Sequence, residues 1–129
     1  MNTTSQVLIV EDNDDLREAM VIALSQLGFE NVTVAVNGQD ALNKLSEQPA
    51  NLVISDLQMP GMDGIGLLAT MKKDVPLACI PFILVSVSLT QEAEKKALGL
   101  GAFACLPKWD IMRGEESFRN LVQRALETK

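Results

Sequence analysis

Short apolar runs alternate along this chain with longer stretches in which apolar residues recur at helical spacing. Five of the short runs predict β-strands, at residues 7–10, 32–36, 52–55, 82–86 and 102–106. The longer stretches predict helices near residues 14–27, 39–47, 65–73 and 91–98, and a last helix that carries Phe118, Leu121, Val122 and Ala125 on one face. This pattern is typical of repeated strand–helix units rather than of a sandwich or a helical bundle.

The first helix has the clearest end signals. Either Asp14 or Asp15 is expected to cap its amino end, because a short acidic side chain accepts a hydrogen bond from a free backbone N–H there. Glu18, three residues beyond Asp15, completes the spacing of a capping box. Gly28 is expected to end the helix, since glycine tolerates the left-handed backbone found at many helix termini.

Strands that are each followed by a helix leave little room for hairpins, so they predict a parallel sheet with right-handed crossovers and helices on both faces. We expect an α/β, flavodoxin-like, doubly wound fold with five strands in the order 2-1-3-4-5 and five helices. The 129 residues, 47% of them hydrophobic, fit a single domain over residues 1–129 with its core at about 6–127.

The charge balance limits the classes of partner. A formal net charge of −6 predicts repulsion from nucleic-acid phosphates and from anionic membrane surfaces, so we expect no direct nucleic-acid or membrane binding. Cys79 and Cys105 have apolar neighbours and no CxxC spacing, and the sequence shows no signal peptide and no apolar run of membrane-spanning length. These features predict a reduced, soluble, cytoplasmic protein.

Three acidic residues are expected to meet at one edge of the sheet. Glu11 and Asp12 follow the first strand and Asp56 follows the third, and in the predicted order these strands are neighbours whose carboxyl ends flank the ligand-binding crevice. Two carboxylates about 4 Å apart repel by roughly 1 kcal/mol in water and about 4 kcal/mol at a protein surface. Spreading apart, protonation or a bound cation would relieve this repulsion. Oxygen ligands without His or Cys favour Mg²⁺, which typically keeps positions for water and phosphate.

Two further strand ends supply groups that suit a phosphoryl ligand. The fourth strand ends at the hydroxyl of Ser86, and the fifth is followed by the ammonium of Lys108. A phosphoryl group held by Mg²⁺ needs donors and positive charge for its other oxygens, and these side chains provide both. The sequence therefore predicts a phosphoryl-binding site at the carboxyl edge of the sheet.

The ordered set of motifs resembles the receiver domains of two-component response regulators, of the single-domain, chemotaxis-regulator-like kind, over about residues 7–126. The motifs are Val10-Glu-Asp12, Asp56-Leu-Gln-Met-Pro-Gly-Met-Asp-Gly64, Ser86, Gly101-Ala102 and Leu106-Pro-Lys108. The resemblance implies that Asp56 accepts a phosphoryl group and that Ser86 and Lys108 hold its oxygens. It also implies that Asp12, Asp56 and the backbone carbonyl of Gln58 ligate Mg²⁺, and that Glu11 reaches the metal through water.

The same resemblance implies partners and a kind of activity. The donor would be a histidine kinase or a histidine phosphotransfer protein. The phosphorylated chain would control a downstream protein through the surface formed by its fourth helix, fifth strand and fifth helix. Such a chain is a signalling protein that catalyses its own aspartyl phosphorylation and dephosphorylation, not an enzyme with a separate substrate.

Two positions depart from the family pattern. The family usually carries an aromatic residue three positions before the active-site lysine, where this chain has Cys105, expected to be a small buried residue. The lysine is usually followed by proline through a cis peptide, where this chain has Trp109. A cis bond to a non-proline residue costs about 2.5–4 kcal/mol, so we expect a trans bond and an exposed Trp109 that contacts a partner protein.

One other function competes with this interpretation, and two more are disfavoured by single positions or loops of the sequence. A receiver-like module that binds proteins independently of phosphorylation is favoured by the departures at Cys105 and Trp109 and opposed by the full set of active-site residue types. A Mg²⁺-dependent phosphohydrolase would need a second acid two residues after its nucleophile, where this chain has Gln58. An FMN-binding flavodoxin would place a phosphate on the first strand–helix loop, which is acidic here over residues 11–15.

Overall fold

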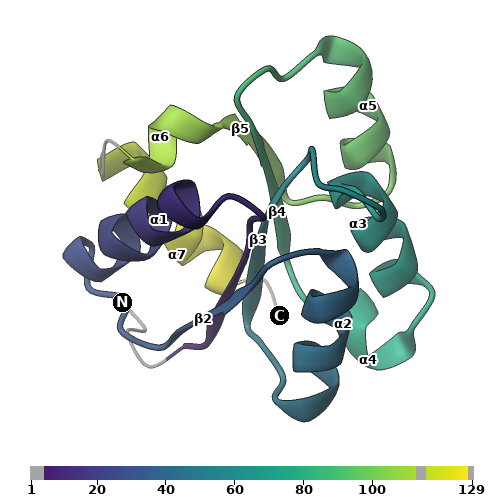
Figure 1. Ribbon diagram of the computed structural model, residues 1–129, viewed down its shortest axis with the longest axis horizontal. Coiled ribbons are helices and arrows are strands. Elements are labelled where there is room, and N and C mark those ends of the chain that lie inside the picture. The colour runs from purple at the N-terminus through teal and green to yellow at the C-terminus, as the bar shows by residue number, and fades with distance from the viewer. Residues whose placement is uncertain (1–4, 113–115, 128–129) are drawn as a thin grey trace.

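Five parallel strands form one sheet in the order β2-β1-β3-β4-β5, which confirms the predicted flavodoxin-like α/β fold (Figure 1). The structure is a computed structural model, and it describes residues 5–112 and 116–127. The strands are β1 (Val7–Val10), β2 (Val32–Ala35), β3 (Leu52–Asp56), β4 (Phe82–Ser86) and β5 (Ala104–Pro107). All their carboxyl ends therefore point to the same edge of the sheet, where the candidate site residues were expected.

Helices cover both faces of this sheet (Figure 1). One face carries α1 (Asp14–Gln26), α6 (Lys108–Met112) and α7 (Glu116–Glu127), and the other carries α2 (Gly38–Glu47), α3 (Gly64–Lys72), α4 (Val75–Ala78) and α5 (Gln91–Gly99). Because successive strand side chains point to opposite faces, Ile9 and Ile54 pack with α1 and α7, whereas Leu8 and Val53 pack with the other group. None of the helices in the described ranges is long and apolar enough to cross a bilayer.

The amino end of α1 differs from the prediction. Asn13, not Asp14 or Asp15, is the N-cap: its Oδ1 accepts a hydrogen bond of 2.9 Å from the backbone N–H of Leu16. An asparagine caps as well as an aspartate, and capping one residue earlier places both aspartates in the first turn, near the positive end of the helix dipole. The carboxyl end agrees with the prediction, since Gly28 follows the helix with φ +98° and its N–H bonds to Ser25.

Two short helices were not predicted, so the described part of the chain holds seven helices rather than five. Helices α4 and α6 span one turn each, which is too short to leave a periodic apolar pattern. Strand β5 also begins at Ala104, later than expected, because the N–H of Ala102 bonds instead to Ala97 at the end of α5. These differences do not move the strand ends that form the candidate site.

The start of α3 fits closely against the end of β3. The N–H of Gly64 donates to the carbonyl of Leu57 at 2.8 Å, so the loop after Asp56 closes directly onto the helix. A Cβ atom at Gly64 would lie 2.4 Å from the backbone oxygen of Asp56 and 2.7 Å from Cδ1 of Leu84. A glycine is therefore needed here by close approach of the backbone, and the fit fixes the position of the Asp56 loop.

Gly64→Ala is expected to lower the free energy of unfolding by about 1–3 kcal/mol, because the new methyl group must displace packed backbone. Gly99→Ala in α5 is a matched control, since a Cβ there has no neighbour within 4 Å; a gain of at most about 1 kcal/mol is expected from helix propensity. Urea unfolding of the native chain and both variants measures the difference. Equal effects of the two substitutions would show that Gly64 is not crowded.

Candidate functional site

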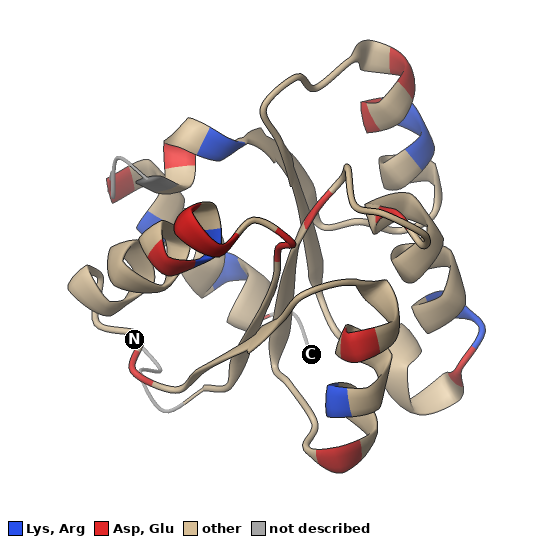
Figure 2. Cartoon of the chain, viewed as in Figure 1, with Lys and Arg blue, Asp and Glu red and all other residues tan. Residues whose placement is uncertain are grey.

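Three carboxylates converge at the carboxyl edge of the sheet. Glu11 and Asp12 follow β1 and Asp56 ends β3, and one carboxylate oxygen from each lies within 4.8 Å of the others. The two strands pair directly, with Val10 opposite Ser55. Figure 2 shows this concentration of acidic positions where β1 runs into α1 and where β3 ends. The structure therefore brings together the three acids that the sequence placed at this edge.

Lys108 enters the cluster from the end of β5. Its Nζ lies 2.7 Å from Oε1 of Glu11 and 3.3 Å from Oδ1 of Asp56. All three side chains are at least 95% buried in these ion pairs. One ammonium thus faces two carboxylates out of contact with solvent, which leaves a net negative charge in a region of low polarity.

Burial and charge together perturb the two buried acids. Removal from water raises the pKa of Asp56 above its ordinary value, although the charge of Lys108, its hydrogen bond and the backbone N–H of Gln58 oppose the rise. The pKa of Glu11 is raised for the same main reason, burial, while Lys108 and the N–H of Asn13 oppose it. Because the single ammonium is shared, it does not cancel the cost of burying both carboxylates. A further cation beside them would be stabilised.

Asp12 differs from its neighbour Glu11 in exposure. Glu11 is buried, and its Oε2 accepts a hydrogen bond of 3.2 Å from the N–H of Asn13. Asp12 is exposed, so its carboxylate is open to an ion arriving from solvent. Three carboxylates with an open side, in a chain that has no histidine, are a donor set that fits Mg²⁺ and fits zinc or copper poorly.

The remaining predicted residues lie around the same edge. Ser86 is fully buried at the end of β4, directly after Val85, which pairs with Asp56. Its hydroxyl oxygen accepts a hydrogen bond of 3.1 Å from the N–H of Ser88. Gln58 is exposed, two residues beyond Asp56. The hydroxyl and the ammonium thus come from neighbouring strands, β4 and β5, on the side of Asp56 opposite to β1.

Sequence reasoning missed one contact that shapes this site. Arg17 in α1 donates from Nη1 to the backbone carbonyl of Glu11 at 3.0 Å and pairs through Nη2 with Asp14. The only signal in the sequence is an arginine within the acidic first turn of a predicted helix. That signal is indistinguishable from an ordinary surface ion pair, because it does not reveal the contact with the backbone of residue 11.

At the two positions that depart from the family pattern, the exposed Trp109 and the absence of a cis bond before it agree with the prediction, whereas Cys105 is less buried than predicted. The described residues contain no cis peptide bond, and Trp109 is 46% exposed at the start of α6. Cys105 is half-buried and packs against the core beneath α3 and α5. Burial, with a smaller contribution from Glu94, raises the pKa of its thiol to about 11. Cys105 is therefore a protonated packing residue at neutral pH, not a reactive thiolate.

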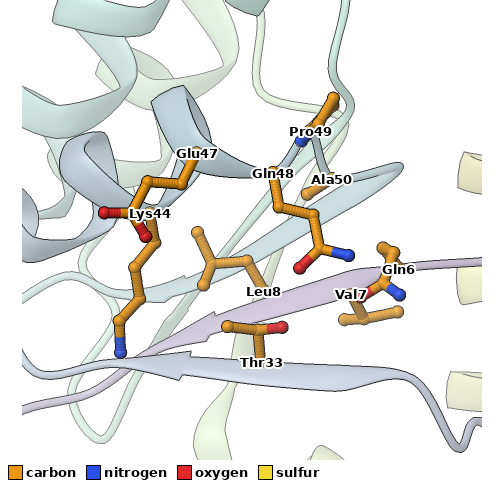
Figure 3. Close-up of a pocket in the computed structure, with 9 residues that line it drawn as sticks. All are labelled: Gln6, Val7, Leu8, Thr33, Lys44, Glu47, Gln48, Pro49 and Ala50. Atoms are coloured by element: carbon orange, nitrogen blue, oxygen red, sulfur yellow. The ribbon is translucent and has the colours of Figure 1, made fainter.

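A separate cavity of about 130 Å³ opens at the other end of the strands (Figure 3). It lies between the start of β1 and the end of α2, and its lining includes Val7, Lys44 and Gln48. None of the predicted site residues lines it. The acidic cluster and this cavity are therefore independent features at opposite ends of the sheet.

Comparison with known proteins gives consistent relatives. Residues 7–125 match the family described as the response regulator receiver domain. The chain is 38% identical over 103 residues to "Probable chemotaxis protein CheY" of Rhizobium etli, with 80% of each chain covered. It is 33% identical over 129 residues to chemotaxis protein CheV3 of Helicobacter pylori, covering 92% of this chain but only 41% of that protein. The signal receiver domain of a histidine kinase from Syntrophus aciditrophicus has a TM-score of 0.81 at 30% identity, covering 95% of this chain and 89% of that one.

The matched residues span nearly the whole described chain, and they include every strand end that contributes to the acidic cluster. Together with the sheet order and the buried lysine between two carboxylates, they show that this chain belongs to the response regulator receiver domain family.

Proposed function

We propose that this chain is a phosphoacceptor receiver of a two-component phosphorelay. Asp56 would take a phosphoryl group from a phosphohistidine on a histidine kinase or a histidine phosphotransfer protein. The observation that carries the proposal is the buried Lys108 held between Glu11 and Asp56 beside an exposed third acid, Asp12. Phosphoryl transfer needs a nucleophile, a cation for the phosphoryl oxygens and carboxylates that a metal ion can reach, and this site combines all three.

Each residue has a distinct role in the proposed transfer. An oxygen of the Asp56 carboxylate forms the new bond to phosphorus as the bond between phosphorus and the donor imidazole breaks. Lys108 and the Ser86 hydroxyl hold the phosphoryl oxygens from the β4 and β5 side. Asp12, Asp56 and the Gln58 carbonyl would hold Mg²⁺, with Glu11 acting through water. Bound there, the ion supplies positive charge to the phosphoryl oxygens.

The proposed output is a shift between two conformations. In the present structure Lys108 pairs with Glu11 and Asp56, and the Ser86 hydroxyl accepts from Ser88. Phosphorylation offers both groups new partners, and that differential contact is what biases the equilibrium. Moving a population from 1:99 to 99:1 takes about 5.5 kcal/mol, which several charge-assisted hydrogen bonds can supply. The responding surface is α5, β5 and α7, which would control a downstream protein.

A phosphorylation-independent binding module is the competing function. Cys105 and the exposed Trp109 are the features that favour it. A binding module does not need three carboxylates and a lysine in one place, and bringing them together costs free energy. Phosphoryl transfer does need them. The single-domain organisation over residues 1–129 and the cytoplasmic location stay predictions of the sequence.

Incubation with Mg²⁺ and acetyl phosphate should add one phosphoryl group to the native chain, measured by intact mass. Asp56→Asn should abolish the adduct, because the amide is not a nucleophile, and EDTA should abolish it in the native chain. Asp63→Asn is a matched control that should label normally, because Asp63 is an exposed N-cap of α3 and asparagine caps a helix as well as aspartate does. An adduct on the Asp56→Asn chain would place the acceptor elsewhere. No adduct together with no change in Trp109 fluorescence on adding beryllofluoride and Mg²⁺ would favour the binding module.

Lys108→Met should abolish labelling and also lower the free energy of unfolding at pH 8 by about 3–5 kcal/mol, since it leaves two buried carboxylates without their cation. The pKa values of Glu11 and Asp56 are raised in the folded chain, and losing the ammonium raises them further. As the pH falls, the carboxyls of the folded chain protonate before those of the unfolded chain, and a neutral carboxyl no longer needs the ammonium. The loss of unfolding free energy caused by Lys108→Met should therefore become smaller towards pH 5.

Denaturant unfolding at the two pH values, with Lys95→Met on exposed α5 as the control, measures this effect. A loss that is equal at both pH values, or larger at pH 5, would show that Lys108 does not neutralise the buried acids.

Trp109→Ala should slow transfer from a histidine kinase about tenfold while leaving labelling by acetyl phosphate unchanged. The reason is that Trp109 is an exposed aromatic side chain next to Lys108, and exposed aromatic residues often dominate protein contacts. Transfer rates are measured with the phosphorylated kinase and with acetyl phosphate, using Val75→Ala on exposed α4 as the control. Equal slowing with both donors would assign Trp109 to the site itself, and no slowing with the kinase would remove it from the partner contact.

A further inference from the structure

Arg17 is a mostly buried cation that lies beside the acidic site. The proposed phosphoryl transfer gives this residue no role. Its side chain is only 17% exposed, whereas that of its ion-pair partner Asp14 is 87% exposed. The guanidinium divides its donors: Nη2 pairs with Asp14, and Nη1 donates to the backbone carbonyl of Glu11 at 3.0 Å. The planar, rigid fork of arginine can serve two such acceptors at once.

The Glu11 carbonyl belongs to the peptide group that leads into Asp12. Because a peptide group is planar, holding this carbonyl also fixes the amide nitrogen of Asp12. The next peptide group is held as well, since the N–H of Asn13 donates to Oε2 of Glu11 at 3.2 Å. Asp12 thus lies between two fixed peptide groups, one held by Arg17 and the other by Glu11.

This arrangement matters because Asp12 is the exposed member of the acidic cluster. The buried members are held through their side chains by Lys108. An exposed carboxylate has few contacts of its own to fix it, so its direction depends on its backbone. We infer that Arg17 is a positioning residue for Mg²⁺ binding, which acts by fixing the peptide group before Asp12. The inference rests on the proposed function, since it assumes that this cluster takes Mg²⁺.

An electrostatic role and a positioning role of Arg17 predict opposite changes in Mg²⁺ affinity when the arginine is replaced. A guanidinium near a cation site repels the cation, so a purely electrostatic role means that a neutral residue tightens Mg²⁺ binding. A positioning role means that it weakens binding, as is typical when a group that orients a metal ligand is removed. The sign of the change therefore separates the two roles.

Calorimetric titration of the whole chain with MgCl₂ is the test, comparing the native chain with Arg17→Met, Arg17→Lys and Asp14→Asn. Arg17→Met is expected to weaken Mg²⁺ binding about tenfold or more. Arg17→Lys, which keeps one donor and the charge, should recover part of the loss. Asp14→Asn is the matched control, because it removes the exposed ion pair and leaves the bond to Glu11; its affinity should stay within about twofold of native.

A second measurement separates positioning from general damage to the fold. The rate of labelling by acetyl phosphate is measured against Mg²⁺ concentration. Arg17→Met should need about tenfold more Mg²⁺ for half-maximal rate but reach a maximal rate close to native. A merely structural role would lower the maximal rate or the urea midpoint without moving the Mg²⁺ dependence. If Arg17→Met does not fold, Arg17→Lys carries the same comparison with a smaller shift.

The outcomes distinguish the two levels of the proposal. If the native chain binds Mg²⁺ and Arg17→Met binds it equally or more tightly, the positioning role alone is overturned. Absence of Mg²⁺ binding by the native chain overturns the proposed receiver chemistry and the positioning role with it.

Discussion

The candidate site depends on one interaction, the sharing of a single buried ammonium by two buried carboxylates. Lys108 contacts both Glu11 and Asp56, and the three side chains are almost entirely removed from water. Their summed charge is negative, and burial raises the pKa of both acids. Such a cluster is costly in isolation. It is tolerated because β1, β3 and β5 are each held in a sheet that packs against a hydrophobic cluster on both faces. The stability of the core holds together a site that would otherwise spread apart.

The cost of the cluster also supports the chemistry proposed for it. An arrangement short of one positive charge is stabilised by any cation that reaches it, and Asp12 provides the open side. Glu11 and Asp12 are adjacent in sequence but differ completely in exposure. The longer glutamate side chain is occupied by Lys108 and the N–H of Asn13, whereas the shorter aspartate faces solvent. The contacts of the two residues therefore support the proposed direct metal ligation by Asp12 and the proposed indirect role of Glu11.

The sequence predicted the strands and the converging residues because both depend on simple rules. Fully buried parallel strands read as continuous apolar runs, and polar residues at their carboxyl ends must meet at one edge. Other features depend on competition between similar groups. Asn13, Asp14 and Asp15 are all good caps, and only the three-dimensional path of the loop selects Asn13. Helices α4 and α6 were not predicted because a helix of one turn is too short to show a repeating spacing of apolar residues. The bond from Arg17 to the Glu11 carbonyl has no sequence signature, since it joins a side chain to backbone.

Lys108 links the site to the rest of the fold in a direct way. It follows β5 and is the first residue of α6, and Ile111 of the same helix is fully buried in the core shared with α1 and α7. A change in the partner of its ammonium therefore acts on a segment that is fixed at both ends. The exposed Trp109 lies between Lys108 and that buried residue. Trp109 therefore belongs to the short segment that joins the site to the core. Half-buried Cys105 leaves β5 without a large aromatic group, and the exposed aromatic side chain next to the lysine is that of Trp109.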